Sequence, residues 1–279
     1  MNTRNSISFG LMAMVTALFL GVVSCAPSAP QLKKIMEDNP DVLYAAMRKD
    51  PVKFLEVVNE VAEKAKSQKE EQQFEEGFKS PLKPAMDDNR LWEGPKDAPI
   101  TIVEYSDFQC PYCHQGHETM GKVVEAYPGK IRIMMKNYPI DRLHPQARKM
   151  SHLFEAMGTK DKAKAIEFKN YLFAHQDDFT PNDSEKKSKT QEEFMAKYNK
   201  RVDADLAKVV KKFGFDFAEL TKIGATEPIK KLVDEDGAEA QKFGFSGTPG
   251  YLVNGVAVRG AYPIEAFKSI IDRHLAAKK

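Results

Sequence analysis

Hydrophobic and polar positions along the chain follow two different patterns. Between residues 31 and 78, apolar side chains recur at helical spacing, which predicts α-helices. From residue 100 onward, short β-branched runs alternate with amphipathic stretches, as strands and helices do in an α/β domain. Prolines gather between residues 80 and 99, so we place the boundary between the two parts near residue 96.

The longest helix predicted in the N-terminal part has one apolar face. It begins at Asp50-Pro51, a pair typical of a helix start. The apolar face consists of Phe54, Val57, Val58, Val61, Ala62 and Ala65. A helical segment this short cannot bury such a face on itself. The face therefore packs either against the rest of the chain or against another copy in a homo-oligomer.

The C-terminal part continues with further strands and helices. A strand is expected over residues 131–138, and a hairpin over 251–258 turns at an Asn-Gly pair. The region between them, about residues 142–240, is predicted to be helical, with a polar stretch over 177–191 that we expect as an exposed loop. Residues 263–277 form the last predicted helix.

The charge balance argues against one class of partner. The chain carries 42 Lys and Arg against 40 Asp and Glu, and the two signs are interspersed, so the net charge is only +2. Nothing in this pattern indicates a nucleic-acid partner. The chain also has three cysteines, an odd number that needs an explanation.

The first residues of the chain have the pattern of an export signal. Arg4 precedes an apolar run over residues 7–23, and small residues follow just before Cys25. Export would place the protein in a compartment where disulfides form and persist.

Two cysteines follow the first strand predicted in the C-terminal part. Residues 100–105 are apolar and β-branched, and they lead through a turn to Cys110 and Cys113. A helix is predicted to start at Cys110 and to continue as an amphipathic helix to Tyr127. Residues three apart on a helix are neighbours, so the two cysteines can form a disulfide. Pro111 suits the first helical turn because it lacks an N–H group.

The helix start favours a thiolate at Cys110. Free backbone N–H groups and the helix dipole stabilise an anion there, and the first thiol of a Cys-X-X-Cys pair typically has a lowered pKa. We therefore assign Cys110 as the nucleophile of disulfide exchange and Cys113 as the resolving thiol.

Other interpretations of the cysteine pair stay open. Cys-X-X-Cys-His is also the attachment pattern of haem c, although a strand that runs directly into the pair fits haem poorly. A zinc site would use Cys110, Cys113, His114 and His117, but four ligands from two turns of one helix rarely form a tetrahedron. Two buried structural cysteines would conflict with the turn position. The remaining histidines, among them His144, show no spacing that indicates a partner.

Residues 107–113, Asp-Phe-Gln-Cys-Pro-Tyr-Cys, resemble the active site of the DsbA family of thiol–disulfide oxidoreductases. The resemblance covers roughly residues 97–279. It implies an α/β, thioredoxin-like fold with a helical insertion at about residues 142–240. Residues 25–96 would then form an α-helical N-terminal segment and a linker.

The same resemblance implies roles for further residues. Glu104 falls where the family carries a buried acid that handles protons near the second cysteine, whereas its position alone predicts a strand residue facing solvent. Thr248 and Pro249 resemble the cis-proline loop, which offers backbone groups to a bound substrate chain; the alternative is a plain turn. Pro111 and Tyr112 are the other candidates for substrate binding.

Two features near the N-terminus resemble known sequences. Residues 22–25, Val-Val-Ser-Cys, resemble a bacterial lipobox, which implies that residues 1–24 are a lipoprotein signal peptide and that Cys25 carries the lipid. This modification would account for the third cysteine. Residues 38–43 resemble the N-terminal stalk through which ScsC-like proteins oligomerise; the alternative is a monomeric helical arm.

We therefore predict a disulfide oxidoreductase of the bacterial cell envelope, periplasmic and lipid-anchored to a membrane. It would form disulfides in exported proteins through Cys110 and Cys113, exchange electrons with a membrane redox partner, and need no organic cofactor or metal. An oligomeric disulfide isomerase or reductase is the alternative. Two other classes stay open: a copper-binding protein that uses the cysteines and His114, and a non-catalytic surface protein that keeps the fold as a scaffold.

Overall fold

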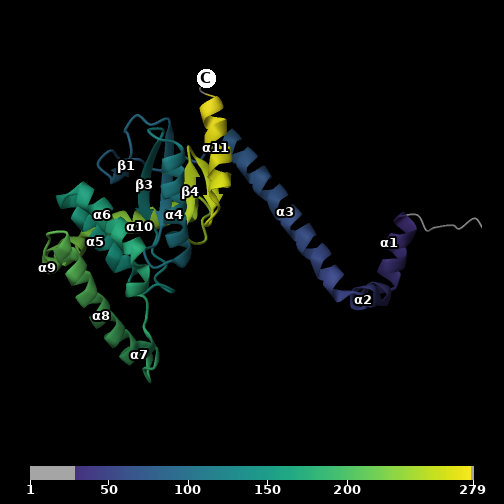
Figure 1. Ribbon diagram of the computed structural model, residues 1–279, viewed down its shortest axis with the longest axis horizontal. Helices are drawn as coiled ribbons and strands as arrows, with labels where there is room; N and C mark the ends of the chain where they lie inside the picture. Colours follow the sequence, from purple (N-terminus) through teal and green to yellow (C-terminus); the bar gives the residue numbers. More distant parts are fainter. Residues whose placement is uncertain (1–28, 278–279) are drawn as a thin grey trace, which may run out of the picture. The chain divides into compact units, whose positions relative to one another are not determined.

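The computed structural model describes residues 29–277, which divide into two compact units (Figure 1). One unit ends at Ser67, and the other begins at Gln68. The predicted signal peptide and the lipidation candidate Cys25 lie outside the described residues. Within residues 29–277, none of the helices combines the length and the apolar character that crossing a bilayer requires.

The N-terminal unit is helical, as the sequence predicts. It contains α1 (Ala29–Asp38), α2 (Pro40–Lys49) and the first part of α3 (Pro51–Lys79). Prolines begin α2 and α3 because the first helical residues need no free N–H, and the Asp50 carboxylate accepts the backbone N–H of Lys53 at 3.0 Å. Several large apolar side chains of α3 are exposed: Val52, Leu55, Val57, Val58 and Val61.

The C-terminal unit is built on a mixed sheet with the strand order β1-β3-β2-β4-β5. Its strands within the described residues are β1 (Trp92–Glu93), β2 (Ile100–Ser106), β3 (Ile131–Asn137), β4 (Gly250–Val253) and β5 (Val256–Arg259). β2 and β3 run parallel, and the other neighbouring pairs are antiparallel. All residues of β2 and β3 except Thr101 and Arg132 are buried, as expected of central strands that are covered on both faces.

Helices cover both faces of this sheet. On one face, α4 (Pro111–Ala126) and α11 (Ile264–Ala276) pack on β-branched and aromatic side chains of the strands. The last turns of α3 add Phe74 and Phe78 to the same core. On the other face, α10 (Glu227–Lys242) packs against β3. The sheet is therefore the middle layer of three. Packing on both faces holds β2 in place.

A helical insertion separates β3 from β4, as predicted. Its helices are α5 (Ala147–Lys160), α6 (Lys162–Ala174), α7 (Asp183–Lys186), α8 (Gln191–Lys212), α9 (Phe217–Gly224) and α10. In Figure 1, α7, α8 and α9 lie to one side of the sheet, whereas α10 packs on its face. Phe154, Phe168 and Leu206 of the insertion are buried in one core with Phe108 and Cys113 of the neighbouring turn and helix. Because of this apolar packing, the insertion is an integral part of the C-terminal unit.

The prediction of an exposed loop over residues 177–191 is wrong in part. A 3₁₀ helix (Gln176–Phe179) and α7 lie in this stretch. Phe179 is buried in the insertion core, and the carboxylate of Glu185 pairs with Arg201 of α8 at 2.7 Å. The polar composition thus reflects an ion pair and helix capping, which compensate for the cost of burying polar groups.

The C-terminal unit begins earlier than the boundary near residue 96. Two side chains bond to carboxylates of α3. Tyr262, just before α11, donates to Glu70, and Arg273, within α11, donates to Glu75. β1 also lies before that boundary and pairs with β3. The last turns of α3 therefore belong to the C-terminal unit by packing and by hydrogen bonding.

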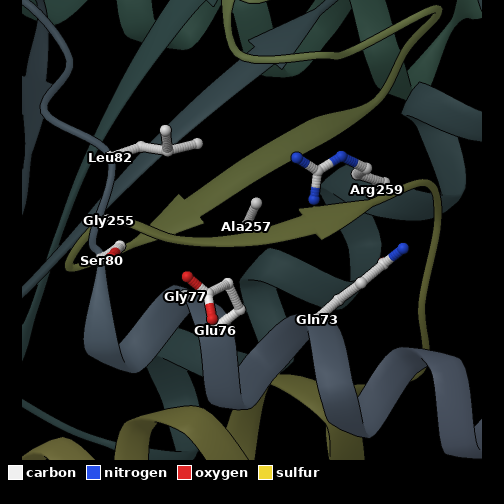
Figure 2. Close-up of a pocket in the computed structure, with 8 residues that line it drawn as sticks. All are labelled: Gln73, Glu76, Gly77, Ser80, Leu82, Gly255, Ala257 and Arg259. Atoms are coloured by element: carbon white, nitrogen blue, oxygen red, sulfur yellow. The ribbon is translucent and has the colours of Figure 1, made fainter.

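A groove of about 350 Å³ lies between α3 and β5 (Figure 2). Side chains of α3 extend toward the strand across it. The residues that line it are Gln73, Glu76, Gly77, Ser80, Leu82, Gly255, Ala257 and Arg259. No predicted site residue lines the groove, so it is separate from the cysteine pair.

Arg90 holds three parts of the C-terminal unit together. Its guanidinium donates to both carboxylate oxygens of Asp236 in α10, at 2.9 and 2.7 Å, and to Glu155 in α5 at 3.4 Å. The same carboxylates accept the backbone N–H and the side-chain amide of Asn137 at the end of β3. Both acids are nearly fully buried, so they depend on this cation.

Replacing Arg90 with Leu should destabilise the protein by about 3–5 kcal/mol, because the buried Glu155 loses its cation and the buried Asp236 keeps only the more distant Lys136, at 3.9 Å. Urea unfolding measures this loss. Arg148→Leu is the matched control, since Arg148 pairs with Asp141 and Asp234 at the surface and should cost about 1 kcal/mol or less. Equal losses in the two variants would contradict the assignment.

Candidate active site

The end of β2 delivers the cysteine pair. β2 ends at Ser106, and α4 begins at Pro111, so Cys110 is the residue that immediately precedes the helix, with extended φ and ψ of −75° and 120°. The backbone N–H of Cys113 donates to the Cys110 carbonyl at 2.9 Å, which closes the first turn. Both cysteines have free thiols in this structure, and both are buried. The sequence predicted Cys110 at the start of a helix and Cys113 one turn later, and the structure places both residues there.

The two thiols differ strongly in acidity. A hydrogen bond with the Cys113 thiol, aided by Thr248 and by backbone N–H groups of the first turn, lowers the pKa of Cys110 to about 6. Burial raises the pKa of Cys113 well above its usual value, and the neighbouring Cys110 adds to that shift. The arrangement thus places one thiolate at Cys110 and keeps Cys113 protonated.

The loop before β4 lies directly against this thiolate. The Thr248–Pro249 peptide bond is cis, and the carbonyl oxygen of Thr248 lies 3.4 Å from Sγ of Cys110. A side chain at Gly116 of α4 would come within 2.0 Å of the Tyr251 hydroxyl and 3.3 Å of the Pro249 ring. Only glycine at that position lets the helix and the loop approach so closely.

Pro111 and Tyr112 lie on the outer side of the pair. Pro111 is exposed, and Tyr112 exposes 62% of its surface, which is unusual for so large a side chain. The cysteines, the cis peptide bond and these two side chains are brought together at one end of the sheet.

Glu104 lies within β2 and is 2% exposed, so it does not face solvent. Burial raises the pKa of Glu104 above its usual value, while the positive charge of Lys169 and the nearby Ser106 hydroxyl oppose the shift. Tyr251, its partner across the β2–β4 pair, is buried too, and burial together with the charges of Glu104 and Cys113 raises its pKa. The setting of Glu104 within β2 favours the protonated form of this acid.

Lys169 is a site residue that the sequence did not reveal. It lies in α6 of the insertion, its side chain is 5% exposed, and it forms an ion pair with Glu93 of β1. Burial lowers the pKa of His117 to about 4, and the positive charge of Lys169 is the second-largest cause of that shift. No local pattern could have connected Lys169 with Glu104, because 65 residues separate them.

The histidines next to the pair have partners other than a metal. Nδ1 of His114 lies 2.7 Å from the Phe173 carbonyl oxygen, and the His117 ring stacks on the Phe173 ring. Residues 29–277 contain no group of three or more His, Cys, Asp or Glu side chains placed to hold a metal ion.

Residues 86–273 match the model of the family described as Thioredoxin. The chain belongs to the thioredoxin family. Among curated relatives, a Na(+)/H(+) antiporter NhaA 1 of Salinispora arenicola is 30% identical over 204 residues, which are 73% of this chain but 28% of that protein. The chain thus matches little more than a quarter of that relative's length.

Two other proteins are similar over more of their own length. A "Probable disulfide bond formation protein D" of Bacillus cereus is 28% identical over 186 residues, which cover 65% of this chain and 77% of that protein. The oxidised structure of BdbD from Bacillus subtilis superposes with a TM-score of 0.56 at 20% identity, covering 70% of this chain and 97% of that one. These similarities confirm the prediction of a thioredoxin-like fold.

Alkylation of the reduced protein should modify Cys110 and spare Cys113 at pH 7, because only the thiolate reacts and the pKa of Cys110 is about 6. The rate should fall as the pH drops through about 6. Iodoacetamide with peptide mass spectrometry measures both. Faster modification of Cys113, or a rate midpoint near the ordinary thiol value of 9.0, would contradict the assignment.

Proposed function

We propose that this protein forms disulfide bonds in exported proteins. The observation that carries the proposal is the contrast between the two thiols, since a pair whose outer cysteine is a stable thiolate favours its own reduced state. Such a pair passes its disulfide to a client rather than removing one.

The proposed exchange proceeds in two steps. A client thiolate attacks Sγ of Cys110, the Cys110–Cys113 disulfide breaks, and the electron pair leaves on Cys113. Cys113 then takes up a proton, for which the buried Glu104 is the proposed donor. A second client thiolate attacks the mixed disulfide and releases Cys110 as the thiolate. The client loses two electrons, and the cysteine pair gains them.

The loop before β4 is the proposed binding site for the client backbone. Next to Cys110, Thr248 and Pro249 present main-chain groups at the end of β4, where an extended segment can pair with them. The exposed ring of Tyr112 and the neighbouring Pro111 add an apolar contact. No metal or organic cofactor is needed for these steps.

The oxidised protein should convert a reduced, unfolded client to its disulfide form with one disulfide transferred per Cys110–Cys113 pair. Cys110→Ser and Cys113→Ser should each abolish the transfer, because neither variant can form the Cys110–Cys113 disulfide; offered a client disulfide instead, Cys113→Ser should accumulate the mixed disulfide, because Cys110 attacks and the resolving thiol is missing. Client thiols are counted by mass spectrometry after alkylation. Full transfer by the Cys110→Ser variant would refute the proposal.

An oligomeric isomerase is the second candidate, and one observation favours it. The side chains of Val57, Val58 and Val61 in α3 are exposed, and a contiguous apolar face of this kind indicates a partner. Several active sites held together would then act on one misfolded client.

In that case, Val58→Glu should convert an oligomer to a monomer and abolish the repair of a scrambled-disulfide client while leaving thiol oxidation intact. Asn59→Glu is the matched control, since it adds the same charge at a neighbouring polar position. Light scattering and client refolding are the measurements. A truncation in this series starts at Gln68, because the last turns of α3 pack on α11. If the wild-type protein is a monomer and does not repair the scrambled client, the isomerase is excluded and thiol oxidation remains the proposed activity.

Attachment to a membrane through Cys25 and electron exchange with a membrane redox partner complete the proposal. A lipid on the first residue of the mature chain would keep the cysteine pair in the bacterial periplasm, near such a partner. Cys25→Ser should move the protein from the membrane fraction to the soluble fraction; unchanged fractionation would exclude the anchor.

A further inference from the structure

Asp107 is the residue that touches both cysteines through its backbone. Its carbonyl oxygen accepts the N–H of Cys110 at 3.1 Å, and its own N–H points to Sγ of Cys113 at 3.4 Å. It occupies the turn between β2 and α4, so its side chain is fixed relative to both sulfur atoms.

The carboxylate of Asp107 is completely buried, and both of its oxygen atoms have hydrogen-bond partners. It accepts the backbone N–H of Gln109 at 2.8 Å on one oxygen, and that of Ile140 at 2.7 Å on the other. The second oxygen also meets Nδ1 of His144 at 2.8 Å. Each of these neighbours is a nitrogen atom, which suits a carboxylate that only accepts hydrogen bonds.

A buried negative charge on the residue whose backbone holds Cys110 would by itself disfavour the thiolate. Two like charges in a site shielded from water raise the energy of the second ionisation. The site therefore combines a carboxylate that the turn needs with a thiolate that catalysis needs.

His144 lies where it resolves this conflict. Its hydrogen bond with Asp107 raises the pKa of His144, and the negative charges of Asp107 and Cys110 raise it further, against a smaller opposing effect of burial. Those are the charged groups that act on the ring; in its own segment, Asp141 is paired with Arg148. Because the attraction of two charges is mutual, a charged imidazole also favours the thiolate.

We propose that His144 is a positioning residue of the active site, which neutralises the buried carboxylate of Asp107 and so keeps Cys110 in its thiolate form. The inference rests on the proposed function of Cys110 as the nucleophile. His144 acts through the charge of Asp107 and through the attraction between the imidazolium and the Cys110 thiolate. A purely structural role, in which the ring only anchors residues 140–146 to the turn, is the competing explanation.

The alkylation rate of Cys110 as a function of pH separates the two explanations in the full-length reduced protein. His144→Gln keeps a hydrogen-bond donor but removes the charge, so the midpoint should rise by about one pH unit. His175→Gln, at an exposed position, should leave it unchanged. An unchanged midpoint in His144→Gln would overturn the proposal.

The double variant Asp107→Asn, His144→Gln is the decisive comparison. With the carboxylate charge gone, the thiolate no longer needs the imidazolium, so the midpoint should return close to the wild-type value. A double variant as high as His144→Gln, or higher, would assign the residue a structural role and overturn the proposal.

NMR titration of the native His144 ring provides a test that needs no change at His144. In the reduced protein the imidazole pKa should be higher than in Cys110→Ser, because the thiolate stabilises the imidazolium. Equal values in the two proteins would overturn the proposal even if His144→Gln fails to fold. Neither measurement involves a client, so a failure of client oxidation leaves both results interpretable.

Discussion

The groups at the start of α4 stabilise one anion, the Cys110 thiolate, and the surrounding structure holds those groups in place. An anion at the start of a helix is stabilised by free N–H groups and by the helix dipole. Here the thiol of Cys113 adds a hydrogen bond, which lowers the pKa of Cys110 to about 6. These groups are effective only if α4 begins at the correct residue and if the loop before β4 lies against it. Gly116 permits that approach.

The insertion contributes to this site as much as the sheet does. Gln176 of the insertion donates to the carbonyl oxygens of Phe108 and Cys110, at 2.9 and 3.0 Å. Gln109 donates to the Tyr198 hydroxyl and to the Phe179 carbonyl oxygen. The turn that carries the nucleophile is thus held by side chains that come from helices far along the chain. Loosening the insertion would therefore disturb the start of α4 as well as the insertion itself.

The sequence correctly predicted the elements that depend on local residue patterns. The strand that precedes Cys110, the helix start at the cysteines and the Asn-Gly hairpin depend on neighbours within a few residues, and the structure contains all three. The two-residue strand β1 was missed because so short a segment has no periodicity. The domain boundary was placed too late for a related reason: the last turns of α3 look solvated in the sequence, although Phe74 and Phe78 pack on α11.

The electrostatic partners of the site could not be predicted, because they depend on the tertiary fold. Lys169 and His144 lie 65 and 37 residues from the acids that they influence, and both residue types are ordinary at a protein surface. Each places a positive charge near a buried acid, Glu104 in one case and Asp107 in the other. Each therefore reduces the cost of burying a carboxyl group. With the role proposed for His144, the insertion and the segment after β3 supply the positive charges that let a thiolate and buried acids share one site.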